Sequence, residues 1–124
     1  MWDIEYSYIT DWLNELDNKT VAAIFAALEL LQREGPNLGR PLVDTLKGTK
    51  INNLKELRPA SVGRTEIRII FAFDPYRQAI MLLGGDKSKG KTGRAKWSGW
   101  YKSAIPTAEK IYLDHLKHLG ENDG

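Results

Sequence analysis

The sequence predicts an α+β fold, in which a small antiparallel sheet carries an N-terminal helical hairpin on one face and a C-terminal helix follows. Apolar residues recur at helical spacing between residues 10 and 34, and three short, largely apolar segments follow between residues 54 and 83. A last helical pattern covers residues 106–119. A chain of 124 residues is expected to form a single domain over residues 1–124.

The N-terminal third of the chain predicts one strand and two helices. Residues 2–8 alternate between aromatic or aliphatic and polar side chains, which is typical of a half-buried strand. Thr10 can cap a short helix that ends near Leu16, and Asn18 can cap a second helix. The second helix has one apolar stripe at helical spacing: Val21, Ile24, Phe25, Leu28 and Leu31. Gly35 and the following proline end this helix.

Three strands are predicted after a loop over residues 36–53, which is rich in proline and glycine. They cover Leu54–Arg58, Glu66–Phe73 and Ala79–Leu83, and the nearly all-apolar third one is expected at the centre of the sheet. The second strand alternates between its faces, with Ile67, Ile69, Phe71 and Phe73 on one and Glu66, Arg68, Ile70 and Ala72 on the other. A turn over residues 74–77 joins the last two strands.

The last helix is expected to have Pro106 in its first turn and to stop at Gly120. Its inward residues are Ala108, Tyr112, Leu116 and Leu119. His115 and His118 lie three residues apart on it, but no carboxylate or cysteine cluster completes a metal site. We therefore expect His115 to be a hydrogen-bonded, partly buried side chain and His118 to be exposed.

The composition bounds the class of protein. Hydrophobic residues make up 42% of the chain and charged residues 27%, as in globular proteins, and no apolar run reaches the length of about 18 residues that a membrane span needs. The absence of cysteine excludes disulfides, thiolate metal sites and cysteine nucleophiles. Since the acidic, polar N-terminus does not have the form of a signal peptide, a cytoplasmic protein is expected.

Charge is unevenly distributed along the chain. Residues 1–34 carry seven acids and two bases, residues 35–102 fourteen bases and five acids, and residues 103–124 four acids and two bases. A basic centre between acidic ends fits an anionic partner bound on one face. The alternative is an acidic helical face opposite a basic sheet edge, with no partner.

The most informative segment is DKSKGKTGRAKWSGWYK, residues Asp86–Lys102. Its cations, Lys87, Lys89, Lys91, Arg94, Lys96 and Lys102, surround the rings of Trp97, Trp100 and Tyr101. Because cations neutralise phosphates and rings stack on unpaired bases, this segment indicates contact with a nucleic acid. The alternative is a solvated loop whose aromatic residues anchor it to the core.

Two arginines in neighbouring strands are candidates for phosphate chemistry. Arg58 and Arg68 are expected together in one solvent-accessible patch, on the sheet face away from the helical hairpin, where they could clamp a scissile phosphate. On this interpretation, Arg68→Ala spares the fold. The alternative pairs each arginine with Glu56 or Glu66 in cross-strand salt bridges, and the spacing leaves both interpretations open.

Together these segments resemble the HigB branch of the RelE/ParE superfamily of bacterial toxins, a group described as phage-derived toxin-like proteins. The resemblance runs from about Val21 to Leu119. It is carried by the helical hairpin, LKELRP (Leu54–Pro59), EIRIIFAF (Glu66–Phe73) and IMLLGGDKS (Ile80–Ser88). The tail WYKSAIPTAEKIYLDHL (Trp100–Leu116) is similar to that of one subgroup.

The resemblance implies the toxin of a toxin–antitoxin pair, acting as a ribosome-dependent endoribonuclease on messenger RNA. In that chemistry the ribose 2′-hydroxyl attacks the adjacent phosphate and leaves a cyclic phosphate and a 5′-hydroxyl, without a metal or other cofactor. The implied partners are a cognate helix-turn-helix antitoxin, in a hetero-oligomer with the toxin, and the ribosome with its mRNA, but no membrane.

The resemblance also implies roles for single residues. Arg58 and Arg68 match the basic sheet residues of the family, and Lys87 and Lys89 match the lysines after its last strand. The chain lacks the family's histidine here, so Tyr101 or a lysine is the candidate acid, while Glu56 is either the base or a group that orients Arg58. The candidate RNA-binding residues are Lys55, Lys89, Lys91, Arg94, Lys96, Trp97 and Trp100.

Other functions fit the same fold. A non-catalytic toxin of this superfamily inhibits DNA gyrase, and the basic residues favour the ribonuclease over it. A binding module for structured RNA and an inactive toxin copy that is kept as a partner for an antitoxin are the remaining alternatives, since a fold by itself does not determine activity.

Overall fold

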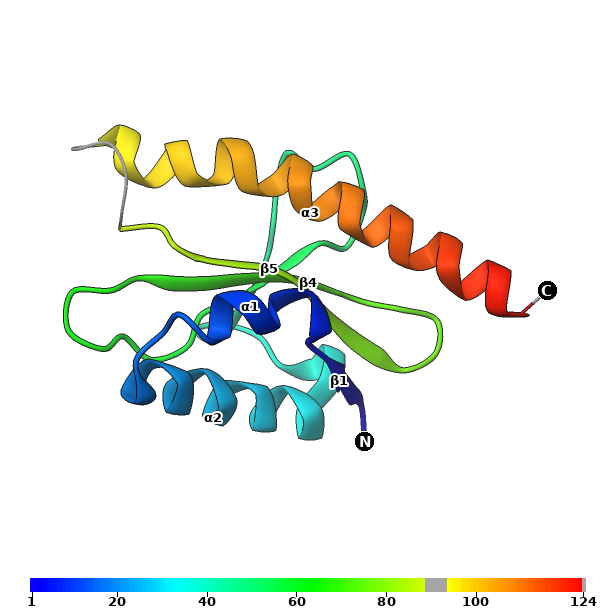
Figure 1. The fold of residues 1–124 in the computed structure, drawn as a ribbon, viewed down its shortest axis with the longest axis horizontal. Coiled ribbons are helices and arrows are strands. Elements are labelled where there is room, and N and C mark those ends of the chain that lie inside the picture. Colours follow the sequence, from blue (N-terminus) through cyan, green and yellow to red (C-terminus); the bar gives the residue numbers. More distant parts are fainter. Residues whose placement is uncertain (89–93, 124) are drawn as a thin grey trace.

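The computed structural model describes residues 1–88 and 94–123, and the side chains of residues 1–88 and 99–120. In these residues five strands form one sheet, in the order β1-β5-β4-β3-β2. The strands are β1 (Asp3–Glu5), β2 (Val43–Thr45), β3 (Lys55–Leu57), β4 (Ile67–Phe73) and β5 (Gln78–Asp86). The helices are α1 (Thr10–Leu13), α2 (Asn18–Glu34) and α3 (Arg94–Asp123), with 3-10 turns η1 (Ser7–Ile9) and η2 (Gly35–Asn37). Figure 1 shows α1 and α2 on one face of the sheet and α3 on the other.

The predicted α+β class is confirmed, but the sheet is mixed rather than wholly antiparallel. Strands β2 to β5 pair as antiparallel neighbours, whereas β1 runs parallel to β5, with Ile4 opposite Ala79. The predicted strand over residues 2–8 is shorter in the structure, because the Ser7 N–H donates to Glu5 Oε1 at 2.8 Å and the chain turns into η1. The middle strand is β4, and β5 lies beside it.

The N-cap of helix α2 lies one residue earlier than predicted, so the helix itself begins at Asn18. Asp17 rather than Asn18 is the N-cap, because Asp17 Oδ1 accepts the Thr20 N–H at 2.7 Å. This hydrogen bond lowers the pKa of Asp17 below its usual value. The helix ends at Glu34, as predicted, and its buried residues are Thr20, Ile24, Ala27, Leu28 and Leu31. Phe25, expected in this stripe, is 39% exposed at its edge.

The sheet separates two apolar layers, as the alternation in β4 predicts. Ile67, Ile69 and Phe71 pack with α1 and α2, whereas Ile70 and Ala72 face α3. The second layer contains Ala104 and Ala108 of α3 together with Leu54, which precedes β3. Most of the sheet face opposite the helical hairpin is therefore covered by α3 rather than open to solvent.

Helix α3 is much longer than predicted. It begins at Arg94, so residues 94–102 are helical rather than part of a loop, and it continues past Gly120 to Asp123. Pro106 lies inside the helix on an exposed side, where the carbonyl that proline leaves without an intrahelical partner can be solvated. No helix in the described part of the chain is long and apolar enough to cross a membrane.

Two glycines at the end of β5 let both layers approach the sheet closely. A Cβ on Gly84 would overlap with the Trp12 ring from the α1 side, and a Cβ on Gly85 would overlap with the Trp100 indole from the α3 side. Because real Cβ atoms do not approach other atoms so closely, larger residues here would displace one helix or the other. Gly85 thus determines how near the first half of α3 lies to β4 and β5.

A hydrogen-bonded chain ties the N-terminal segment to the second half of α3. The Tyr8 hydroxyl lies 3.0 Å from His115 Nδ1, and His115 Nε2 lies 3.2 Å from Asp74 Oδ2. Since a carboxylate only accepts, His115 Nε2 donates to Asp74, and in the neutral imidazole Nδ1 accepts from the Tyr8 hydroxyl. The prediction of a satisfied, buried His115 and an exposed His118 is confirmed, with His115 8% exposed.

Candidate active site

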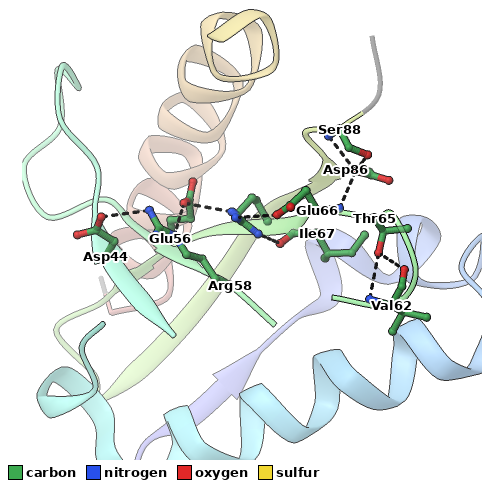
Figure 2. Close-up of polar contacts among 10 residues, drawn as sticks. Asp44, Glu56, Arg58, Val62, Thr65, Glu66, Ile67, Asp86 and Ser88 are labelled. Carbon is green, nitrogen blue, oxygen red and sulfur yellow. Dashed lines mark hydrogen bonds and ion pairs between the residues drawn. The ribbon is translucent and has the colours of Figure 1, made fainter. Parts of the chain in front are cut away.

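A line of alternating charges crosses three strands on the α3 face of the sheet, and Figure 2 shows its contacts. Arg58 Nε donates to Glu56 Oε1 at 2.9 Å, and Arg58 Nη2 donates to Asp44 Oδ2 at 3.1 Å. Arg68 Nε lies 3.5 Å from the same Glu56 Oε1, while Arg68 Nη2 donates to Glu66 Oε2 at 3.1 Å. Glu56 is therefore the carboxylate that joins the two arginines.

Strand parity explains this arrangement. Glu56 and Arg58 share the face of Leu54, and Arg68 shares the face of Ile70, which lies opposite Glu56 in the ladder between β3 and β4. The prediction that the two arginines come together on the face away from the helical hairpin is confirmed. The alternative salt bridges with glutamates are present as well.

The predicted solvent-accessible position of Arg68 is wrong. The Arg58 side chain is 32% exposed, but that of Arg68 is only 11% exposed, and Arg68 Nη1 donates to the Ile67 carbonyl at 2.8 Å. The physical reason is the length of α3. Trp100 lies against Gly85, which is the cross-strand neighbour of Arg68, so the first half of the helix covers the guanidinium.

Glu56 is a buried carboxylate whose two oxygens have different contacts. The residue is 1% exposed. Its Oε1 accepts the hydrogen bond from Arg58 Nε and lies 3.5 Å from Arg68 Nε in an ion pair that is not a hydrogen bond. Among the residues that the structure describes, Glu56 Oε2 has no hydrogen-bond partner. A buried charge is costly unless cations compensate it, and here two guanidiniums do so. Oε2 is therefore an acceptor held inside a cationic environment, in a carboxylate that the Tyr101 hydroxyl also approaches.

Lys87 and Tyr101 complete the site from two other elements. The Lys87 N–H donates to the Glu66 carbonyl at 3.0 Å, which extends the ladder past β5, and Lys87 Nζ lies 5.5 Å from the centre of the Tyr101 ring. Burial lowers the pKa of Lys87, and the nearby Arg68 lowers it further. Burial, a side-chain hydrogen bond with Glu56 and the charge of that carboxylate raise the pKa of Tyr101, whose hydroxyl stays protonated at neutral pH.

These groups line an open cleft of about 450 Å³ between α3 and the edge of the sheet. Its lining residues are Arg40, Asp44, Thr45, Leu46, Lys47, Glu56, Arg58, Lys87, Tyr101 and Ile105. Four of the five candidate catalytic residues thus share one cleft, and Arg68 lies behind Glu56. An anion that enters meets cationic donors at Arg58 and Lys87, beside a carboxylate that can accept a proton.

The predicted RNA-binding residues do not all gather here. Lys55 lies on the opposite strand face from Glu56, and its Nζ donates to Thr45 Oγ1 at 3.1 Å. Trp100 packs on Gly85 and, at 4.9 Å between ring centres, on the Tyr101 ring, so it anchors α3 to the sheet. Two of the predicted residues, Lys89 and Lys91, lie outside the described residues. Arg94, Lys96 and Trp97 belong to α3, but their side chains lie outside the described part.

Strand β2 supplies one wall of the cleft, which the sequence pattern did not predict. Asp44 is the main residue of this wall, in a three-residue strand inside a segment that was predicted to be a loop. The one apolar residue of this strand is Val43, which is buried in the structure. A single apolar residue does not form the alternating pattern by which a strand is predicted from sequence. Among the described residues, no three His, Asp or Glu side chains come together as metal ligands would.

Comparisons with known proteins support the resemblance found in the sequence. Residues 11–113 match the family described as Phage derived protein Gp49-like. The Mycobacterium tuberculosis protein named "Putative toxin HigB2" is 49% identical over 93% of this chain, which spans 54% of that protein. A second protein of that organism, named "Putative toxin HigB3", is 48% identical over 80% of this chain and 79% of its own length. The chain thus spans about half the length of the first of these curated relatives and most of the second.

The matched family covers both the helical hairpin and the cleft, from α1 into the second half of α3. Identity near one half over most of the chain leaves no doubt about common descent. The chain belongs to the Gp49-like family of phage-derived proteins and is similar to HigB toxins.

Proposed function

We propose that the protein is the toxin of a toxin–antitoxin pair and cleaves messenger RNA on the ribosome. The observation that carries this proposal is the convergence of Glu56, Arg58, Lys87 and Tyr101 on one cleft, from β3, the end of β5 and α3. Its relatives are named as toxins, and toxins of this class act with an antitoxin. The cleavage chemistry is the one that the resemblance to the RelE/ParE superfamily implies, and the groups in the cleft are assigned to its steps.

The proposed reaction needs a proton acceptor, a proton donor and a cation. The ribose O2′ attacks the adjacent phosphorus and loses its proton to Glu56 Oε2, the oxygen that has no hydrogen-bond partner among the described residues. The P–O5′ bond breaks as the O2′–P bond forms, and the leaving O5′ takes a proton from the enzyme. Arg58 donates to the phosphate oxygens, where negative charge develops in the transition state.

Lys87 suits the role of proton donor better than Tyr101 does. A general acid is most effective when its pKa lies near the working pH. The pKa of Lys87 is lowered from 10.5 toward this range, whereas that of Tyr101 is raised further from it. We therefore assign the proton transfer to Lys87, and to Tyr101 the role of a hydrogen-bond donor beside Glu56.

Expression in bacteria of wild type, Arg58→Gln and Lys87→Gln tests the proposal, with primer extension on a translated transcript as the readout. Wild type should arrest growth and cut within the translated region, and free RNA should be cut poorly without ribosomes. Each variant should cleave more slowly by on the order of a hundredfold, because it loses a group that acts in the transition state. Both side chains are partly exposed, and a glutamine at position 58 can still donate a hydrogen bond to Glu56, so the fold should survive with some loss of stability.

Arg64→Gln is the matched control, since Arg64 is an exposed arginine that does not line the cleft. It should cleave like wild type. Equal cleavage by Arg58→Gln and wild type would show that the site is assigned wrongly. If wild type itself leaves the transcript intact, the ribonuclease proposal fails, and a supercoiling assay then distinguishes a gyrase inhibitor from a binding module or an inactive copy.

A further inference from the structure

Asp44 is a charged residue of the cleft whose purpose the proposed reaction does not explain. It lies in the middle of β2, directly opposite Glu56 in the antiparallel ladder. Two carboxylates in such a pair repel each other and destabilise the sheet. Because the Arg58 guanidinium contacts both carboxylates, the repulsion is replaced by two charge-assisted hydrogen bonds.

The Asp44 carboxylate is itself held firmly. Its Oδ1 accepts the Thr45 N–H at 3.0 Å, and its Oδ2 accepts Arg40 Nη2 at 2.8 Å as well as Arg58 Nη2. The hydrogen bond from Arg40, with that from Thr45 and the charges of both arginines, lowers the pKa of Asp44, so the group stays ionised at neutral pH. Asp44 is thus a fixed anion at the cleft wall.

The two carboxylates determine how Arg58 is turned. Its Nε is bound to Glu56 and its Nη2 to Asp44, and a planar guanidinium with two anchored nitrogens has little rotational freedom. Among the described residues, the hydrogen bonds and ion pairs of Arg58 involve Nε and Nη2 but not Nη1. The two N–H groups of Nη1 therefore remain as donors for a ligand in the cleft.

We propose that Asp44 is a positioning residue, which holds the Arg58 guanidinium so that its Nη1 donors face a phosphate bound in the cleft. The inference rests on the proposed function for the identity of that phosphate, but not for the orientation of Arg58. Asp44 touches no substrate atom in this proposal and acts only through Arg58. Without it, Arg58 keeps its charge and its bond to Glu56 but loses its fixed plane.

Single-turnover cleavage of translated mRNA by Asp44→Asn separates positioning from simple electrostatics. If Asp44 positions Arg58, the cleavage rate falls about ten- to hundredfold, since small misplacement of a reacting group has effects of this size. The apparent affinity for RNA should stay equal or increase, because the variant removes a negative charge from the cleft. Asp44→Glu, which retains the carboxylate, should recover part of the rate. Glu29→Gln, the same acid-to-amide change on an exposed residue of α2, should have no effect.

Nitrogen-15 NMR of the arginine side chains gives a second measurement, which does not depend on activity. Wild type should show slow rotation of the Arg58 guanidinium, and Asp44→Asn should show fast rotation for Arg58 while Arg68, held by Glu66 and the Ile67 carbonyl, is unchanged. Unchanged Arg58 rotation in Asp44→Asn would overturn the inference. An unchanged cleavage rate with higher RNA affinity would also overturn it. Absence of cleavage by wild type would reject the proposed function alone, since the NMR result would still decide the role of Asp44.

Discussion

Replacing Arg68 by methionine should destabilise the protein strongly, contrary to the expectation that this position tolerates substitution. Methionine has a similar length but no charge, so the change removes the cation and leaves the packing nearly intact. Glu56, which is 1% exposed, then loses one of the two guanidiniums beside it, and the Ile67 carbonyl loses a donor. Removing one partner of a buried ion pair costs about 3–5 kcal/mol.

The lower part of that range applies here, because Arg68 Nε lies 3.5 Å from Glu56 Oε1 and Glu66 is 34% exposed. We therefore expect a loss of about 3 kcal/mol in the free energy of unfolding, out of a typical total of about 5–15 kcal/mol. For a chain of 124 residues this corresponds to a decrease in Tm of roughly 10–15 °C.

Urea denaturation of four proteins measures this effect: wild type, Glu56→Gln, Arg68→Met and the double variant. The double variant leaves no charged Glu56 behind, so its loss should be smaller than the sum of the two single losses by about 1–3 kcal/mol. Arg40→Met is the control, because Arg40 is 75% exposed in its ion pair with Asp44 and such pairs contribute at most about 1 kcal/mol. A loss below about 1 kcal/mol for Arg68→Met, or additive single losses, would refute the reasoning.

Two further predictions concern the contact of α3 with the sheet and the charge of the cleft. Gly85→Ala should lower the free energy of unfolding by about 1–3 kcal/mol and shift the Trp100 fluorescence, because the new Cβ overlaps with the indole. The control Gly39→Ala, which meets open space, should change little, and equal effects of the two would contradict the packing. RNA binding at low salt should weaken as pH rises through the lowered pKa of Lys87, because its charged form is the one that attracts phosphate. Lys87→Arg, which keeps its charge, should extend binding to higher pH, so identical pH profiles for wild type and Lys87→Arg would argue against Lys87 as a phosphate contact.

Much of the candidate site could be predicted from strand parity. Side chains alternate along a strand, so Glu56 and Arg58 had to share one face, and Arg68 had to lie on the same side of the next strand as Ile70. The tight turn between β4 and β5 makes these strands antiparallel, so Lys87, which follows β5, lies beside Glu66, which precedes β4. The role of each residue is still a proposal, since alternation determines where a side chain lies and not what it does.

The burial of Arg68 could not be predicted, because it depends on α3. A proline is usually found in the first turn of a helix, so Pro106 indicated a helix start and left residues 94–102 in a loop. In the structure the helix passes through Pro106, and Trp100 can then reach Gly85 and cover the guanidinium behind it.

By itself, the sequence determined the α+β class, the two faces of β4, the end of α2 at Gly35 and the resemblance to the HigB toxins. These features depend on local periodicity, on residues that end helices and on ordered short motifs, all of which can be read along the chain. Only the tertiary structure decided that Asp44 lies opposite Glu56, that β1 runs parallel to β5 and that Arg68 is buried. These features depend on contacts between segments far apart in the chain, and three-residue strands such as β1 and β2 are too short to show a pattern of their own.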